Sequence, residues 1–211
     1  MCAADQRQIL VETARALTHG RTGNLSVRSG AGFLITPSGI PNESLQPDQV
    51  VFMALEGSCP GEQLKPSSEW RFHRDLYLQR YDIGAIIHTH STYATVLACL
   101  RKPIPAFHYM VADAGGEDIR CAEYATFGTQ ALSDNIITAM QDRKACLMAN
   151  HGMLAVGDDL AEALERAQLV EELAKQYVLA LQTGDPVILS SQEMAVNLEK
   201  FKRYGKQNEE N

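Results

Sequence analysis

The longest regular pattern in the chain lies between Asp158 and Gly184, and it limits the possible folds more than any other feature. Apolar residues recur there at intervals of three and four, as on one face of an α-helix: Leu160, Leu164, Ala167, Val170, Ala174, Tyr177 and Leu181. The spacing predicts a long helix that opens at Asp158 and stops before Gly184 and Pro186. Its apolar stripe has to pack against another layer of the protein.

Short apolar segments alternate with candidate helices along the rest of the chain. The patterns predict strands at 24–28, 32–36, 50–55, 83–90, 145–151 and 153–156. They predict helices over Gln6–Thr18, from Ser67 onward and from Ser91 through Ala98, with Ser67 and Ser91 as N-caps. Hairpins mixed with helices are typical of a layered α/β or α+β fold around one central sheet, whose strand order these patterns leave open.

Composition and charge indicate the broad class of the protein. Of the 211 residues, 45% are hydrophobic and 21% are charged, which is typical of a globular protein. The chain has no internal repeat and no break in composition, so we expect one domain over residues 1–211. The formal net charge of −7 argues against nucleic-acid binding, because phosphate backbones are held by clustered Lys and Arg. No apolar run is long enough to predict a membrane span.

Cysteine usage bears on the location of the protein. The five cysteines are an odd number without paired spacing: Cys2, Cys59, Cys99, Cys121 and Cys146. This usage fits reduced thiols in a cytoplasm better than a set of disulfides. The first residues also lack the basic start and apolar run of a signal peptide. We therefore expect a cytoplasmic protein.

Three histidines form a candidate metal site. His88 and His90 are two residues apart at the end of a predicted strand, so their side chains project from the same face. His151 ends another predicted strand, beside Gly152, where backbone can approach closely. Three imidazoles leave coordination positions open for substrate oxygens. The alternative is that these are ordinary hydrogen-bonded histidines, and spacing alone does not decide between the two.

The remaining histidines lack this pairing. We expect His73 to be structural and leave His108 open.

Eight segments of the chain carry a family resemblance. In order they are Thr22–Ser26 (TGNLS), Leu34–Pro41 (LITPSGIP), Pro66–His73 (PSSEWRFH), His88–His90 (HTH), Ile104–Met110 (IPAFHYM), Tyr124–Thr129 (YATFGT), Asn150–Gly152 (NHG) and Leu198–Gly205 (LEKFKRYG). Their order resembles the class II aldolase/adducin family over nearly the whole chain, and within it the aldolases that act on L-fuculose 1-phosphate.

The resemblance implies a fold and an assembly. The expected fold is α/β, with three α/β/α layers and a central, largely antiparallel sheet. The expected assembly is a homotetramer with sites at subunit interfaces, and a C-terminal tail of about 195–211 is expected to cover the site. The expected cofactor is Zn²⁺, with Mn²⁺ or Co²⁺ as other divalent metals that would serve.

The resemblance also implies residue roles. His88, His90, His151 and Glu69 correspond to metal ligands, and Glu69 also to the general acid/base of the reaction. Tyr109 corresponds to a catalytic tyrosine that a neighbouring subunit supplies. Further residues correspond to substrate-binding positions: Asn24, Ser38, Gly39, Ser67 and Ser68 for the phosphate, and Phe127, Phe201 and Tyr204 for the aldehyde.

Physical arguments accompany some of these roles. Ser67 and Ser68 would offer hydroxyls and free N–H groups at a helix N-terminus, which is a ready anion site. Without the family, Ser67 and Ser68 would be only a capped helix and Ser38-Gly39 only a turn. The segment 18–24 is shorter than the usual family form, which affects the expected phosphate contacts and Arg21.

Three functions follow from the resemblance. The first is a metal-dependent aldolase that reversibly cleaves a ketose 1-phosphate to dihydroxyacetone phosphate and a short aldehyde. L-Fuculose 1-phosphate, 5-deoxyribulose 1-phosphate and 5-(methylthio)ribulose 1-phosphate are the candidate substrates. The second is a pentulose-phosphate 4-epimerase or a methylthioribulose-1-phosphate dehydratase on the same scaffold. The third is a non-catalytic module like the adducin head, against which the three histidines and Glu69 argue.

Overall fold

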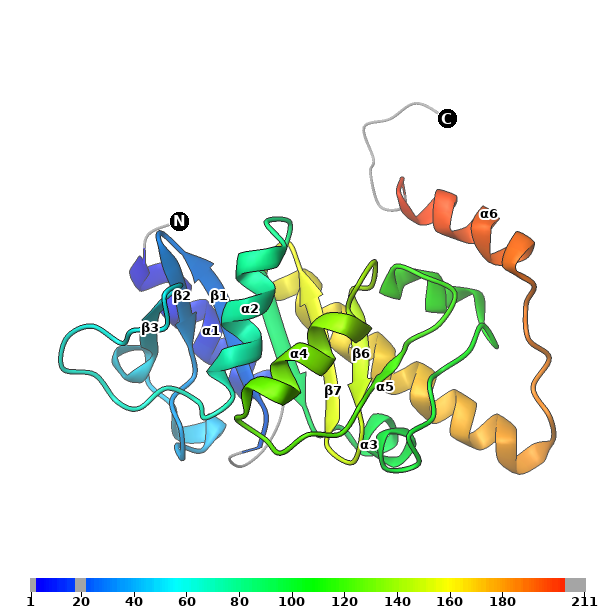
Figure 1. Ribbon diagram of the computed structural model, residues 1–211, viewed down its shortest axis with the longest axis horizontal. Coiled ribbons are helices and arrows are strands. Elements are labelled where there is room, and N and C mark those ends of the chain that lie inside the picture. The colour runs from blue at the N-terminus through cyan, green and yellow to red at the C-terminus, as the bar shows by residue number, and fades with distance from the viewer. Residues whose placement is uncertain (1–2, 18–21, 204–211) are drawn as a thin grey trace.

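A single mixed sheet forms the centre of the protein. The computed structural model describes residues 3–17 and 22–203 (Figure 1). Seven strands lie in the order β3-β2-β1-β4-β7-β6-β5. Their bounds are β1 Asn24–Ser29, β2 Gly32–Ile35, β3 Val51–Ala54, β4 Ala85–Thr89, β5 Cys121–Ala122, β6 Ala145–Met148 and β7 Gly152–Gly157. All neighbouring strands are antiparallel except β5 and β6, which are parallel.

Helices cover both faces of this sheet. α1 (Ala3–Leu17), α3 (Thr92–Cys99) and α5 (Leu160–Thr183) lie on one face, and α2 (Trp70–Gln79) and α4 (Gln130–Ala139) lie on the other (Figure 1). Each face has its own apolar cluster, and successive strand residues alternate between the two. Ala85 and Ile87 of β4 face α5, whereas Ile86 faces α2. The predicted three-layer α/β/α arrangement with a largely antiparallel sheet is therefore confirmed.

The double coverage explains the apolar strands. All residues of β4 and β7 are buried, so these strands show continuous rather than alternating apolar runs. The long predicted helix is also present as α5, and Gly184 follows it at the C-cap position. The sequence patterns did not predict α4.

Two predicted helix caps differ from the structure. α2 begins at Trp70 rather than after Ser67, because the Trp70 N–H donates to the Ser67 carbonyl oxygen in a turn that precedes the helix. Ser91 occupies the N-cap position of α3 but its side chain makes no capping hydrogen bond. The Glu171 carboxylate of α5 instead accepts from the N–H groups of Tyr93 and Ala94, both at 2.9 Å.

The predicted strand 145–151 is also shorter in the structure. β6 ends at Met148, and residues 149–151 form the turn into β7. Asn150 has a φ of 54°, in the left-handed region, which no strand can accommodate. His151 therefore lies in a turn and not at a strand end.

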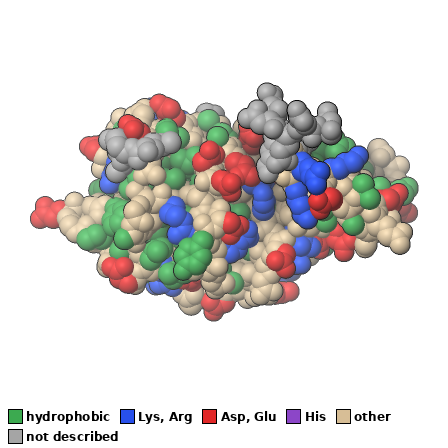
Figure 2. Space-filling view, turned by 90° about the horizontal axis from the view of Figure 1, so that it is seen from above, with side chains coloured by type: hydrophobic (Ala, Val, Ile, Leu, Met, Phe, Trp, Pro, Cys, Tyr) green, Lys and Arg blue, Asp and Glu red, His purple; other side chains and the backbone are tan. Residues whose placement is uncertain are grey.

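The C-terminal helix α6 (Ser191–Phe201) stands apart from the sheet. An extended segment joins it to α5, and it packs against the 3₁₀ helix Tyr109–Ala114 (Figure 1). Seen from above, acidic, basic and apolar side chains are interspersed on this face of the molecule (Figure 2). None of the described helices combines the length and apolar character that crossing a membrane requires.

Candidate metal centre

Two neighbouring strands bring the three histidines together. His88 belongs to β4 and His90 follows it directly, while His151 lies in the β6–β7 turn. β4 and β7 are paired with Thr89 opposite Met153, so the end of one strand lies beside the start of the other. Gly152 allows this approach, because a Cβ atom there would lie 2.4 Å from the Thr89 carbonyl oxygen.

The three imidazoles converge on one point. One ring nitrogen from each of His88, His90 and His151 lies within 4.8 Å of the others. The Nε2 atoms of His88 and His90 are 3.1 Å apart. Two ligands at the usual zinc–nitrogen distance on a tetrahedral zinc would be about 3.3 Å apart. The predicted convergence of these rings is therefore confirmed.

The protonation of the rings suits metal binding. His88 Nδ1 lies 2.8 Å from the Met153 carbonyl oxygen, to which it must donate, so Nε2 is the nitrogen of this ring that could bind a metal. Burial, together with the neighbouring His88, lowers the pKa of His151 to about 4 and also lowers the pKa of His90. At neutral pH these two rings are therefore uncharged, which is the form that coordinates a metal.

A buried carboxylate completes the cluster. Glu69 is 7% exposed, with Oε2 at 3.3 Å from His88 Nε2 and Oε1 at 3.3 Å from His151 Nε2. Burial would raise its pKa, but His88, His151 and a hydrogen bond from Asn24 outweigh this and lower the pKa to about 2. Oε1 accepts no hydrogen bond from the described residues. A buried anion with one unsatisfied oxygen beside three imidazoles fits a divalent metal with nitrogen and oxygen ligands.

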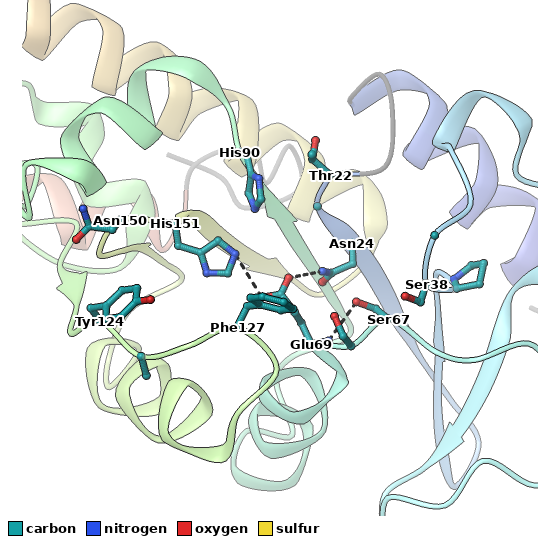
Figure 3. A pocket seen from close by; sticks show the side chains of 15 residues that line it. Thr22, Asn24, Ser38, Ser67, Glu69, His90, Tyr124, Phe127, Asn150 and His151 are labelled. Carbon is teal, nitrogen blue, oxygen red and sulfur yellow. Dashed lines mark hydrogen bonds and ion pairs between the residues drawn. The ribbon is translucent and has the colours of Figure 1, made fainter.

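A pocket of about 340 Å³ opens over this cluster. Its lining combines nine of the predicted site residues: Asn24, Ser38, Gly39, Ser67, Ser68, Glu69, His90, Phe127 and His151. Figure 3 shows Asn24 and His151 pointing at the Glu69 carboxylate, with Ser38 and Ser67 on the side of the pocket away from His151. One pocket is therefore lined by residues of the histidine–Glu69 group, by the serine-rich segments and by an aromatic ring.

Six residues in the pocket lining were not predicted. They are Thr22, Gly23, Pro37, Tyr124, Ala125 and Asn150. Thr22, Tyr124 and Asn150 belong to the TGNLS, YATFGT and NHG strings, so their place in those strings was the available signal. Gly23 has a φ of 80°, and a Cβ atom there would lie 2.5 Å from the His88 carbonyl oxygen. Only glycine allows this loop to pass so close to β4.

Asn24 has partners that the sequence did not indicate. Its amide nitrogen donates to Glu69 Oε2 at 2.9 Å, and its amide oxygen lies 2.5 Å from His73 Nε2. His73 is fully buried, as expected of a structural residue, but its contact with Asn24 links it to the cluster. A phosphate contact for Asn24 stays a prediction.

Two predicted site residues lie elsewhere in the chain. Tyr109 and Phe201 stack on each other, with ring centroids 6.4 Å apart, and neither lines the pocket. Figure 1 shows α6, which carries Phe201, at the upper right, joined by an extended segment to the C-terminal end of α5. The predicted residues Arg21 and Tyr204 lie outside the described residues. Cover of the site by the C-terminal tail of about 195–211 therefore stays a prediction.

Known proteins share both the sequence and the fold. Residues 10–178 match the Class II Aldolase and Adducin N-terminal domain. The 5-methylthioribulose-1-phosphate/5-deoxyribulose-1-phosphate aldolase of Rhodospirillum rubrum is 54% identical over 204 residues, which cover 94% of this chain and 92% of the relative. The L-fuculose phosphate aldolase of Escherichia coli strain K12 is 48% identical over 200 residues, with coverage of 94% and 92%.

A solved structure supports the same assignment. An L-fuculose 1-phosphate aldolase superposes with a TM-score of 0.92 at 46% identity, covering 96% of this chain and 98% of that one. The matched region contains Glu69 and the three histidines His88, His90 and His151. The chain belongs to the class II aldolase and adducin family.

Proposed function

We propose that the protein is a metal-dependent aldolase that reversibly cleaves a ketose 1-phosphate to dihydroxyacetone phosphate and a short aldehyde. The observation that carries the proposal is the buried Glu69 carboxylate, whose oxygens lie 3.3 Å from two imidazole nitrogens, in a pocket that is also lined by Ser38, Gly39, Ser67 and Ser68. A base beside a cation, with an anion site within the same pocket, is what cleavage next to a carbonyl requires. The curated relatives are named as aldolases of such phosphates.

Zn²⁺ is the proposed cofactor, with Mn²⁺ or Co²⁺ able to replace it. His88, His90 and His151 would hold it, with Glu69 as a further ligand in the absence of substrate. A bound divalent cation supplies Lewis acidity that polarises the substrate carbonyl. The soft, uncharged imidazoles favour a transition metal over Mg²⁺ or Ca²⁺, which prefer oxygen ligands.

Glu69 is the proposed acid/base. In the condensation direction it takes a proton from C3 of dihydroxyacetone phosphate, and the resulting carbon nucleophile attacks the aldehyde carbon. The depressed pKa of about 2 leaves the carboxylate ionised at neutral pH, so it is ready to accept that proton. In the cleavage direction Glu69 returns the proton to C3.

The phosphate is expected at the serine-rich side of the pocket. Ser38, Gly39, Ser67 and Ser68 line this side, and backbone N–H groups and hydroxyls can bind a phosphate without a lysine. Gly39 has a φ of 77° and nothing within 4 Å of a Cβ position, so its backbone is open to an approaching oxygen.

The aldehyde is expected at the aromatic side of the pocket. Phe127 and Tyr124 line it and are 64% and 54% exposed in the single chain, so a ligand or a neighbouring subunit can cover them. Tyr109, Phe201 and Tyr204 would reach this side from another subunit of a homotetramer. Tyr109 would then donate the proton that the aldehyde oxygen needs during condensation.

The substrate class is a ketose 1-phosphate with a short deoxy or methylthio tail. L-Fuculose 1-phosphate, 5-deoxyribulose 1-phosphate and 5-(methylthio)ribulose 1-phosphate are the three candidates, and the relatives are named for all three. We place the reaction in the cytoplasm, because the four described cysteines are all free thiols.

The test is a coupled assay with each of the three phosphates. Glycerol-3-phosphate dehydrogenase and NADH report dihydroxyacetone phosphate, so an aldolase consumes NADH with at least one substrate. A 4-epimerase would consume none, and a dehydratase would yield a diketone phosphate detectable by mass spectrometry. Chelation should abolish turnover and added Zn²⁺ should restore it. Turnover that survives complete metal removal would contradict the proposal.

A further inference from the structure

A continuous line of buried polar side chains runs through the α2 side of the core and ends at the metal cluster. Tyr77 OH lies 2.8 Å from Ser26 Oγ, and Ser26 Oγ lies 2.7 Å from His73 Nδ1. His73 Nε2 then lies 2.5 Å from Asn24 Oδ1, and Asn24 Nδ2 lies 2.9 Å from Glu69 Oε2. We call these five residues the Tyr77–Glu69 chain.

The Tyr77–Glu69 chain of side chains lies in the protein interior rather than on its surface. Tyr77, Ser26 and His73 are 0% exposed and Asn24 is 3% exposed. Apolar residues such as Phe33, Phe72 and Leu76 surround it in the core cluster below α2. Buried polar groups destabilise a core unless each one is satisfied, and here every member between the two ends has a partner on both sides.

The donors and acceptors can point in only one direction. The ionised Glu69 can only accept, so Asn24 presents its NH₂ group to Glu69 and its carbonyl oxygen to His73. His73 must then donate from Nε2, which leaves a lone pair on Nδ1. Burial lowers the pKa of His73 to about 3, in agreement with this neutral ring. Ser26 therefore donates to His73 and accepts from Tyr77.

The direction of these hydrogen bonds makes the two carboxylate oxygens of Glu69 different. Its Oε2 is held by Asn24, whereas Oε1 accepts no hydrogen bond from the described residues. A free Asn24 amide could turn over and present its oxygen to Glu69, which would repel the carboxylate. The N–H of His73 prevents this rotation.

We propose that His73 is a positioning residue that, through Asn24, fixes Oε2 of Glu69 and leaves Oε1 as the oxygen that exchanges the substrate proton. This inference rests on the aldolase function proposed above. His73 does not itself line the pocket or belong to the group of three histidines, so its effect reaches Glu69 through its hydrogen bond to Asn24.

Two variants with opposite hydrogen-bonding capacity test the proposal. His73→Gln keeps an N–H near the position of Nε2, while His73→Met fills similar space without a donor. We expect His73→Met to lower kcat and C3 proton exchange by about 10- to 100-fold, with KM and zinc stoichiometry changed less than about threefold. His73→Gln should recover kcat to within about threefold of the wild type. A folded His73→Met with wild-type kcat, or a folded His73→Gln as slow as His73→Met, would overturn the proposal.

A second measurement needs no activity and no variant. In protein labelled with ¹⁵N-histidine, the imidazole shifts of His73 should report a neutral ring protonated at Nε2. A ring protonated at Nδ1, or a charged ring, would contradict the direction of the hydrogen bonds in the Tyr77–Glu69 chain. If the wild type cleaves none of the three ketose phosphates, the proposed aldolase function is wrong. The NMR result still decides whether the hydrogen bonds of the Tyr77–Glu69 chain are as described.

Discussion

Glu69 combines two requirements that a single residue rarely meets. It is buried next to imidazole nitrogens, yet one of its oxygens has no hydrogen-bond partner among the described residues. The carboxylate is therefore close enough to the cation site to be oriented by it and free enough to move a proton. Its neighbours lower its pKa to about 2 although burial opposes this, so the basic form prevails at every physiological pH.

Replacing Glu69 by Gln should separate metal binding from proton transfer. Glutamine keeps the size of the side chain, and His88, His90 and His151 remain to hold the metal. We expect full zinc stoichiometry by mass spectrometry and a loss of C3 proton exchange of about 10² to 10⁴-fold, measured by deuterium incorporation into dihydroxyacetone phosphate. Exchange at the wild-type rate would remove Glu69 from the role of base.

His73 should make the metal-free protein less stable in acid. Burial lowers its folded-state pKa to about 3, below the ordinary 6.5, so the unfolded chain binds the proton first as the pH falls. The stability that depends on a neutral His73 is complete above about pH 6.5 and is lost progressively toward pH 3, at up to about 1.4 kcal/mol per pH unit.

The His73→Gln variant should therefore show a flatter dependence of unfolding free energy on pH. We expect the slope between pH 6 and pH 5 to decrease by about 1 kcal/mol per pH unit in urea unfolding of the metal-free protein. Tyr77→Phe is the matched control, because it removes a hydroxyl from the same buried chain but no titrating imidazole. An equal slope in His73→Gln and the wild type would contradict this account.

The site residues could be predicted to different extents from sequence. The H-x-H pair at a strand end indicated His88 and His90 by spacing, and the position beside Gly152 after a predicted strand indicated His151. Glu69 needed the family strings, since nothing local links it to a metal. The role of Asn24 beside Glu69 could not be predicted, because it depends on β1 lying next to β4 in the sheet. His73 reads as an ordinary buried residue until its partners are known.

At the scale of elements, helix α3 is capped by Glu171, a residue far away in the sequence. The Glu171 carboxylate of α5 accepts from the first free N–H groups of α3, and a Ser at the N-cap position of α3 does not. α3 begins at Thr92, two residues after His90, so this contact fixes the segment that follows the histidine pair. Sequence could not reveal it, because the cap lies 78 residues from the N–H that it satisfies.

Glu171→Ala should therefore destabilise the protein by about 1–2 kcal/mol, since it removes two charge-assisted hydrogen bonds at a helix N-terminus. Urea unfolding at neutral pH measures the change. The adjacent Glu172→Ala offers a matched control, because Glu172 is exposed and, among the described residues, forms an ion pair with Lys175 and a hydrogen bond with Gln176 of its own helix. Equal stability of the two variants would show that the cap contributes nothing.

Element types were predicted better than element ends. The apolar stripe of α5 and the buried runs of β4 and β7 are long enough to determine their own structure. The ends depend on single residues: the positive φ of Asn150 closes β6 early, and the turn at Ser67 delays the start of α2. Such local geometry is decided by tertiary contacts that a pattern of apolar residues does not contain.

At the scale of the whole molecule, the pocket of one chain lacks two expected residues. Tyr109 lies on a 3₁₀ helix anchored to α5 by the buried Arg166, which pairs with Asp113 at 3.0 Å. Tyr109 is itself 49% exposed and stacks on Phe201, away from the pocket lining. In the proposed homotetramer, the half-exposed Tyr109 and the partly buried Phe201 would contribute to the pocket of another copy.

Subunit mixing tests that arrangement. Glu69→Gln and Tyr109→Phe should each have little activity, because each lacks one proton-transferring group. If neighbouring copies share a site, random reassociation of the two variants in equal amounts should restore about a quarter of the wild-type sites. Each variant unfolded and refolded alone is the control. A mixture as inactive as its parents would mean that both residues act within one chain.

The register in which β4 pairs with β7, with Thr89 opposite Met153, has a consequence for the folding of the protein. Sliding β4 by one position would turn His88 to the opposite side of the sheet, away from His151, and His90, which shares its face, would turn with it. An ion that needs all three rings therefore binds only a correctly aligned chain. During synthesis, cation binding would therefore favour the native register of β4 before the cation takes part in any reaction.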